Sequence, residues 1–194
     1  MKVIFDYVMA ICGVIFLAPL LVIVAILIKL TSKGNVFYTQ GRIGRYGKTF
    51  TIIKFRSMTV DHGDSNTVTV GGDMRITKFG AFIRKYKLDE LPELLNILKG
   101  DMSFVGPRPD LPGYADNLKG EDRKILNLRP GITGVASLKY ANEEKILSAQ
   151  KDPIKFHDEV IYPDKVKLNL DYYYNNNLWV DIKIIFATIF RVSY

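Results

Sequence analysis

The sequence predicts an α+β protein that is mostly helical, with one small β-hairpin and an N-terminal membrane segment. Three observations lead to this prediction. Residues 3–28 are almost all apolar, two stretches rich in β-branched and aromatic residues follow between closely spaced glycines, and leucines recur at helical spacing further along. We expect residues 1–30 to form the membrane part and residues 31–194 to form one domain that faces the cytosol.

The apolar run of residues 3–28 is interrupted only by Asp6. It is long enough for a membrane-crossing helix, which needs about 20 residues. It is too long for a secretory signal, and no small-residue cleavage pattern follows it. Pro19 lies in its middle, where a proline removes one backbone hydrogen bond and kinks or breaks the helix.

Two membrane arrangements of this segment remain open. A straight span would leave Met1 outside, because the basic residues that follow the segment favour the cytosolic side. A re-entrant hairpin would instead turn near Ala18 and Pro19 and leave the bilayer on the face where it entered. Hydropathy by itself favours the span. A buried core helix is the third alternative, for which the run is long.

The charge balance indicates an anionic partner. Lys and Arg outnumber Asp and Glu by 27 to 20, which gives a net charge of +7. A phosphorylated substrate, a membrane lipid surface or nucleic acid would suit this charge. We expect no nucleic acid, because the basic residues are spread beside a membrane segment and no recognition module is present. The single cysteine, Cys12, cannot form an internal disulfide, which fits a cytosol-facing domain.

After the apolar run, the stretches "VFYTQ" and "TFTIIKF" predict the two strands of the hairpin. The glycines between them do not open a helix, so they do not form a phosphate-binding loop. Basic residues are frequent here, and one interpretation is a solvated basic face near anionic lipid. These residues are Arg42, Arg45, Lys48, Lys54 and Arg56. Residues 59–73 are polar and rich in glycine, and predict a loop that contains His62.

Three further segments predict helices. Residues 75–100 should form two helical pieces that Gly100 ends, and residues 114–127 should form an amphipathic helix. The tail, residues 168–192, should end in a helix that either lies at the membrane surface or packs on the core. Its apolar side would consist of Trp179, Ile182, Ile185, Phe186 and Ile189.

The adjacent carboxylates Asp89 and Glu90 precede the second of these helical pieces. Because Pro92 is tolerated only in the first turn, that helix should begin near Asp89. Backbone N–H groups and the helix dipole favour negative charge there. An aspartate at an N-cap is common and needs no chemistry, so a simple cap is one interpretation.

The surroundings of the pair favour a reaction centre. Arg84 lies upstream and Arg108 lies downstream in a rigid "GPRP" sequence, so cations could hold phosphate beside the pair. A carboxylate can attack phosphorus once cations or a metal have neutralised the phosphate oxygens. "RPGITG", which begins at Arg129, predicts a second arginine before a tight Pro-Gly turn. His62 and His157 have no partner suggested by spacing and are interpreted as surface histidines.

The sequence resembles the bacterial sugar transferase family, in particular the small monotopic phosphoglycosyl transferases that act on polyprenol phosphate. The resemblance covers almost the whole chain. It rests on the apolar N-terminal hairpin and on "FYTQGRIGRYGKTFTIIKFRSM", "LDELPELLNILKGDMSFVGPRP" and "LRPGITG", in this order and spacing.

This resemblance implies an enzyme of the cytoplasmic face of the bacterial inner membrane. It would move a sugar-1-phosphate from a UDP-sugar to undecaprenyl phosphate, release UMP, and so initiate polysaccharide or glycoconjugate assembly. Asp89 would attack the β-phosphorus to form a covalent phosphosugar intermediate. Glu90 would position or deprotonate the acceptor, and Mg²⁺ held near Asp89 would neutralise the diphosphate.

The resemblance also assigns substrate binding to the basic residues and to one proline of "GPRP". The N-terminal segment would be re-entrant, with its break at Ala18 and Pro19, and amphipathic helices would lie at the interface. Residues 172–190 could pair two copies in a homodimer. The alternative is a non-catalytic basic membrane scaffold that recruits glycan-assembly enzymes. The assigned binding residues are Lys54, Arg84, Pro107, Arg108 and Arg129.

Two departures from the family pattern stand out. The break is often Ser-Pro in the family and is Ala18-Pro19 here, so one hydroxyl that could satisfy freed backbone groups is missing. After "RPGITG", many relatives continue with "WAQVNGR", whereas this chain has "VASLKYANEE". The donor sugar is therefore left open. Without the multi-span N-terminal domain of longer relatives, the chain is expected to be the minimal catalytic form.

Overall fold

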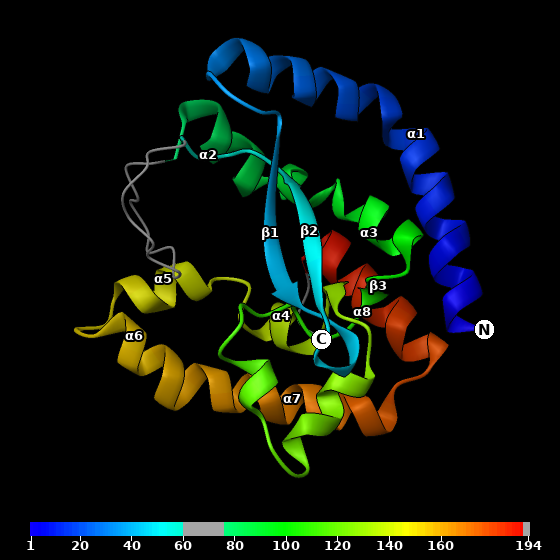
Figure 1. The fold of residues 1–194 in the computed structure, drawn as a ribbon, viewed down its shortest axis with the longest axis vertical. Helices are drawn as coiled ribbons and strands as arrows, with labels where there is room; N and C mark the ends of the chain where they lie inside the picture. The colour runs from blue at the N-terminus through cyan, green and yellow to red at the C-terminus, as the bar shows by residue number, and fades with distance from the viewer. Residues whose placement is uncertain (60–75, 192–194) are drawn as a thin grey trace.

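The computed structural model describes residues 1–59 and 76–191. Most of the predicted loop, with His62, and residue 75 at the start of the first helical piece lie outside the described residues. The described chain is mostly helical, with two small two-stranded sheets, which confirms the mostly helical fold and the hairpin. A long helix, α1 (Lys2–Thr31), runs along one side of the domain and bends over a second side (Figure 1).

Helix α1 contains Pro19 and is long and apolar enough to cross a membrane. Only 11% of its most apolar window is buried, so α1 is not the core helix of the third alternative. Its exposed side chains are largely apolar, and Ile15 and Phe16 are 71% and 84% exposed.

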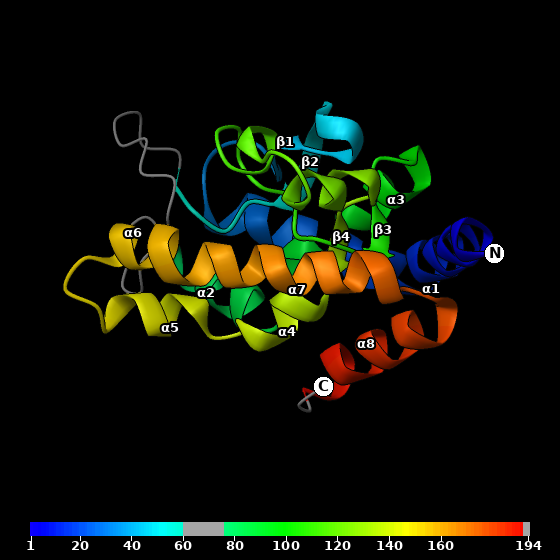
Figure 2. The same ribbon diagram turned by 90° about the horizontal axis from the view of Figure 1, so that it is seen from below.

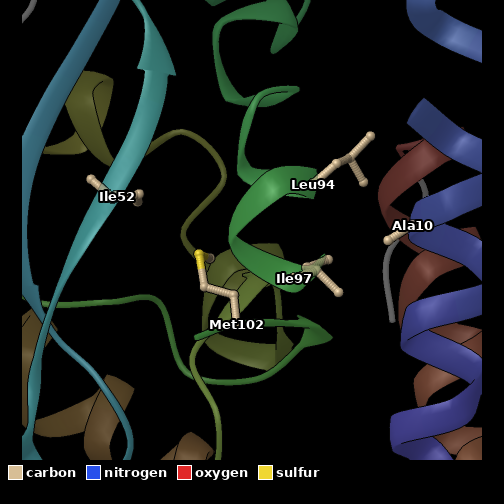
Figure 3. Packing of buried hydrophobic residues seen from close by; sticks show 5 residues of the cluster. All are labelled: Ala10, Ile52, Leu94, Ile97 and Met102. Atoms are coloured by element: carbon tan, nitrogen blue, oxygen red, sulfur yellow. The ribbon is translucent and has the colours of Figure 1, made fainter. Parts of the chain in front are cut away.

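Both halves of α1 pack on the same domain. Before Pro19, Ala10 packs against Leu94 and Ile97, which point toward it from α3 (Glu93–Lys99) (Figure 3). After Pro19, α1 packs with Val24 and Ile28 in a second apolar cluster, together with Phe55 and Ile83. The bend of α1 thus lets one helix follow two sides of one domain (Figure 1).

The first turn of α1 is fixed by buried polar contacts. Asp6 is 2% exposed and accepts hydrogen bonds from Ser103 Oγ at 2.9 Å and from Phe104 N at 3.3 Å. Lys2 Nζ donates to Asp181 at 2.5 Å and to the Val105 carbonyl at 3.0 Å. These contacts attach the start of α1 to the strand that precedes the GPRP sequence.

The predicted hairpin is confirmed as β1 (Phe37–Ile43) and β2 (Thr49–Phe55), which pair antiparallel with Phe37 opposite Phe55. Helix α3 is attached to the edge of β2 through Asn96. The Asn96 amide donates to the Thr51 carbonyl at 2.7 Å and accepts from Ile53 N at 3.0 Å. This contact fixes the position of the β2 side chains relative to α3.

A second sheet pairs β3 (Ser103–Val105) in parallel with β4 (Gly131–Thr133). The predicted tight turn in "RPGITG" is therefore wrong, because Gly131–Thr133 is a strand. Gly106 N donates to the Thr133 carbonyl at 2.9 Å and Gly131 N donates to the Pro107 carbonyl at 2.8 Å. A Cβ on Gly106 would lie 2.2 Å from the Arg129 carbonyl oxygen, so this close approach requires glycine.

The two predicted helical pieces are α2 (Lys78–Lys85) and α3, which ends at Gly100 with φ 84°. Between them lies a 3₁₀ turn, η2 (Leu88–Glu90). The predicted helix over residues 114–127 is wrong: two 3₁₀ turns, η3 (Ala115–Asn117) and η4 (Asp122–Asn127), take its place. Gly120 between them has a left-handed φ of 57°, which interrupts the helix.

After β4 the described chain is helical, and α8 (Leu178–Phe190) confirms the predicted tail helix. One face of α8 buries Ile184 and Ala187, while Trp179, Phe186 and Ile189 are exposed and Ile182 and Ile185 are partly buried. Figure 2 shows α7 crossing the domain with α8 beneath one end. The helical segments are α4 (Val135–Lys139), α5 (Glu143–Ser148), α6 (Pro153–Phe156), the π-helix η5 (His157–Ile161), α7 (Tyr162–Asn175) and α8 (Leu178–Phe190).

Candidate active site

The carboxylate pair lies in η2, one turn before α3, and Asp89 and Glu90 are each 8% exposed. Lys87, just before this turn, has a left-handed φ of 57°. The pair lines a cavity of about 2000 Å³ together with residues from α1, the hairpin, α2, α4 and α5. A charged pair is therefore held at low exposure on the wall of a large cavity.

The cap interpretation does not account for Asp89. The N-cap of α3 is Pro92, and Asp89 Oδ1 is buried without a hydrogen-bond partner. Burial raises the pKa of the Asp89 carboxyl, and the negative charge of Glu90 raises it further. Asp89 lines the cavity, and its Oδ1 is not occupied by a capping hydrogen bond.

In contrast to Asp89, Glu90 forms ion pairs with two cations through one of its carboxylate oxygens. Its Oε1 accepts from Arg108 Nη2 at 2.6 Å and from Lys54 Nζ at 2.9 Å. Burial by itself would raise the pKa of Glu90, but the positive charges of Arg108 and Lys54 outweigh burial and hold that pKa well below its usual value. Two adjacent carboxyls thus have pKa values displaced in opposite directions, a pattern typical of groups with different roles in one reaction.

Glu93, a third carboxylate, was missed by the sequence reasoning. It is 2% exposed and lies 3.1 Å from Lys54 Nζ, so Lys54 bridges Glu90 and Glu93. Burial raises the pKa of Glu93, and the attraction of Lys54 offsets only part of that increase. The spacing of three residues from Glu90 could have indicated this, since such residues share one face of a helix.

Separate parts of the fold bring the cations to this pair. Lys54 comes from β2, which Asn96 holds against α3. Arg108 comes from the GPRP sequence, which β3 and β4 hold in place; its side chain is 46% exposed, and Glu90 raises its pKa. Arg84 lines the same cavity from the end of α2 and pairs with Glu144 of α5.

The other predicted site residues lie elsewhere. Pro107 and Arg129 do not line this cavity, and the Arg129 guanidinium lies at the C-terminal end of α3, close to Gly100. Ala18 and Pro19 lie on α1 and do not line the cavity either. The structure thus brings together Lys54, Arg84, Asp89, Glu90 and Arg108 and leaves these four apart from them.

Two interpretations from the sequence are wrong. His157 is not a surface histidine, because its side chain is 13% exposed, lines the cavity and lies 2.8 Å from Asp158. The hairpin is not a uniformly solvated basic face: Arg45 and Lys48 are exposed, but Arg56 is 5% exposed and the Lys54 side chain 16%. The cations of the hairpin that line the cavity are therefore less exposed to solvent than those that do not.

The cavity also has an apolar wall. This wall is formed by one face of the first half of α1, beside Leu91 and Leu94, and consists of Met9, Cys12, Gly13, Phe16 and Leu17. In the described part of the chain, no group of three or more His, Cys, Asp or Glu side chains could hold a metal ion. The cavity thus combines a buried carboxylate pair and several cations with an apolar surface.

Fold and site together define a class: a protein with a membrane-length helix whose domain carries a buried carboxylate pair between cations. The family described as "Bacterial sugar transferase" matches residues 1–194, and the chain belongs to this family. This confirms the resemblance seen in the sequence.

Curated relatives extend the comparison. The chain is 37% identical to "UDP-glucose:undecaprenyl-phosphate glucose-1-phosphate transferase" of Xanthomonas campestris pv. campestris, with 98% of this chain and 38% of the relative covered. It is 36% identical to "UDP-N-acetylgalactosamine-undecaprenyl-phosphate N-acetylgalactosaminephosphotransferase" of Aeromonas hydrophila (95% and 41% covered). It is 35% identical to "Exopolysaccharide production protein ExoY" of Sinorhizobium fredii (95% and 82% covered). The chain spans about two fifths of the length of the first two relatives.

Proposed function

We propose that this protein is a phosphoglycosyl transferase that moves a sugar-1-phosphate from a UDP-sugar to undecaprenyl phosphate and releases UMP. Such a reaction would start the assembly of a polysaccharide or another glycoconjugate on a lipid carrier. The printed names of the Xanthomonas and Aeromonas relatives state this kind of transfer, with glucose and N-acetylgalactosamine respectively. Family membership over the whole chain supports the same chemistry here.

The observation that carries the proposal is Asp89, a buried residue that lines the cavity and whose Oδ1 has no hydrogen-bond partner. A carboxylate that is neither paired nor capping is free to act as a nucleophile. In the first step Asp89 attacks the β-phosphorus, the bond to the bridging oxygen breaks, and UMP leaves with that electron pair. In the second step an oxygen of the acceptor phosphate attacks the same phosphorus and releases Asp89.

Lys54 and Arg108 have a supporting role in this reaction. They hold Glu90 ionised, which keeps a carboxylate beside Asp89 that can position or deprotonate the acceptor. They also place two cations where the phosphate oxygens develop charge, and such placement supplies most of the catalysis of phosphoryl transfer. Arg84, on the same cavity wall, is a further cation for the phosphates.

The site fits Mg²⁺ held jointly by the protein and the substrate. Mg²⁺ binds through one or two carboxylates plus substrate phosphates and does not need an all-protein cage. Asp89 lines the cavity and would supply one such carboxylate. When bound, Mg²⁺ would neutralise diphosphate charge. Removal of divalent cations by a chelator should therefore stop turnover, and added Mg²⁺ should restore it.

The proposal includes a re-entrant α1 at the cytoplasmic face of the inner membrane. Support comes from the two halves of α1, which pack on one domain on either side of Pro19. A straight span would carry one half across the bilayer and away from that domain. The exposed apolar residues of α8 suit a helix at the same interface.

The test is UMP release by detergent-solubilised protein with Mg²⁺, undecaprenyl phosphate and a panel of UDP-sugars. Asp89→Asn should abolish release while the protein stays folded, and the matched change at an exposed aspartate, Asp122→Asn, should have no effect. Intact-mass detection of a phosphosugar adduct, absent in Asp89→Asn, would establish the nucleophile. No UMP from any donor, together with no adduct, would favour the scaffold alternative.

A further inference from the structure

A further guanidinium, that of Arg42 near the end of β1, lines the same cavity as Asp89 and Arg108. Its Nη2 donates to Gln40 Oε1 at 2.7 Å, and its Nε is buried without a hydrogen-bond partner. Within residues 1–59 and 76–191, Arg42 makes no ion pair with a carboxylate. Arg42 is thus a partly buried cation with an unused donor on a cavity wall.

The electrostatic surroundings do not stabilise this charge. Burial lowers the pKa of Arg42 and the positive charge of Arg108 lowers it further, while Tyr38, Asp110 and Glu93 offset only part of this. A desolvated cation beside another cation costs free energy unless an anion compensates it. The arrangement therefore has the properties of an anion site whose ligand supplies the missing negative charge.

We propose that Arg42 binds the phosphate group that leaves with the nucleotide, the α-phosphate of the donor. This assignment rests on the proposed transferase function and deepens it. Arg108 contacts Glu90 beside the nucleophile and is also a charged neighbour of Arg42. In an in-line displacement the leaving group lies opposite the attacking oxygen, so the leaving phosphate lies further from Asp89 than the transferred one.

The position of Arg42 in the fold favours the nucleotide over the lipid phosphate. The next residue, Ile43, donates its backbone N–H to the Asp110 carbonyl at 2.9 Å. Ile43 packs against Ala115, Ile125 and Leu170, which belong to η3, η4 and α7. The apolar wall suited to the lipid belongs instead to α1, which packs on α3.

A purely structural role is the competing explanation, because Gln40 and Arg42 project from the same face of β1 and bond to each other. Such a role would affect folding but would not distinguish between ligands. The test therefore measures ligand binding and the two substrates separately, and thermal unfolding confirms that each variant is folded.

The experiment compares wild type, Arg42→Gln and Arg42→Lys with the control Arg45→Gln, which removes an equal charge from the same hairpin. Arg45 is exposed and donates to the Asn127 carbonyl, and it does not line the cavity. UMP binding to the detergent-solubilised full chain is measured by calorimetry, and the KM of each substrate is measured by UMP release. In Arg42→Gln the Kd of UMP and the KM of the UDP-sugar should rise about 10- to 100-fold, as for a lost charged hydrogen bond.

The KM of undecaprenyl phosphate should stay unchanged, and Arg45→Gln should behave as wild type. Arg42→Lys should bind UMP with intermediate affinity, because lysine keeps the charge and lacks the planar fork. Unchanged UMP affinity in Arg42→Gln and Arg42→Lys, or a raised KM for undecaprenyl phosphate instead, would overturn the assignment. Should Arg42→Gln fail to fold, wild-type affinity in Arg42→Lys would overturn it.

The experiments can overturn the proposed function and the Arg42 assignment independently of each other. UMP binding that depends on Arg42, in a wild-type protein that transfers no sugar phosphate, would overturn the transferase and leave the anion site standing. If the protein transfers sugar phosphate but its UMP affinity does not change when Arg42 is replaced, only the Arg42 assignment is overturned. A wild-type protein that neither binds UMP nor transfers would overturn both.

Discussion

Arg108 Nη2 lies 2.6 Å from Glu90 Oε1, and this contact joins the GPRP sequence to the carboxylate pair 18 residues earlier in the chain. The contact fixes the charge of Glu90 and so influences Asp89 beside it.

Replacing Glu90 should destabilise the protein. Glu90→Ala leaves Arg108 and Lys54 without their shared carboxylate, and we expect a loss of about 2–3 kcal/mol, below the value for a fully buried pair because Arg108 is half exposed. The folded-state pKa of Glu90 is depressed, so this stability is present above its unfolded pKa and is lost as pH falls through the folded one. Urea unfolding at neutral and acidic pH measures both effects.

The control for this loss is a more exposed ion pair. Glu144→Ala breaks the pair with Arg84, and since the Glu144 side chain is 53% exposed, the loss should not exceed about 1 kcal/mol. Equal losses for the two variants would contradict the importance of burial at Glu90.

Replacing Asp89 should stabilise the fold at neutral pH while it abolishes activity. The folded-state pKa of Asp89 is raised, so the contribution of its carboxyl to stability is fully present below its unfolded pKa and is lost as pH rises through the folded-state pKa. Asp89→Asn is neutral at every pH. Its Tm should exceed that of wild type at neutral pH, by about 2–4 °C per kcal/mol, and the difference should shrink in acid. A lower Tm at neutral pH would contradict the unfavourable burial of the Asp89 charge.

The reaction should lose rate in acid earlier than an ordinary aspartate would allow. Asp89 must be ionised to attack phosphorus, and its pKa is raised above 3.8. The rate of phosphosugar adduct formation should therefore fall through an acid limb above that value. Single-turnover mass spectrometry over a pH series measures this limb. A rate that stays constant from neutral pH down to pH 3.8, with the protein folded, would contradict the raised pKa of Asp89.

The first turn of α1 should be attached to the domain through Asp6. Asp6→Ala leaves Ser103 Oγ and Phe104 N buried without this acceptor, and each buried donor costs about 1–3 kcal/mol. Asp6→Asn keeps one acceptor oxygen and should lose less. Equal Tm values for the two variants would show that these hydrogen bonds contribute nothing.

The re-entrant arrangement predicts that both ends of α1 lie on one side of the membrane. In a Cys12→Ser background, a cysteine added before Met1 and another in Lys33→Cys should react with an impermeant thiol reagent in inside-out vesicles only. Labelling of the two positions from opposite sides would establish a straight span.

Much of this protein follows from local sequence patterns. The apolar run that became α1, the two strands of the hairpin, and α3 with its stop at Gly100 are each determined by residues close together in the chain. The adjacent carboxylates Asp89 and Glu90 could also be recognised in the sequence, because two acidic residues just before a proline at the start of a helix form a local pattern. The failed helix over residues 114–127 has a local cause as well, since Gly120 adopts a left-handed conformation.

The tertiary structure decided which side chains meet. Lys54 reaches Glu90 and Glu93 only because Asn96 attaches β2 to α3, and Arg108 arrives only because β3 pairs with β4. The burial of Arg42 and the displacement of Arg129 from the site depend likewise on packing between distant segments. The periodicity of apolar residues in the sequence predicts local secondary structure. Burial, ion pairing and pKa shifts depend on contacts between residues far apart in the chain, which the linear sequence does not show.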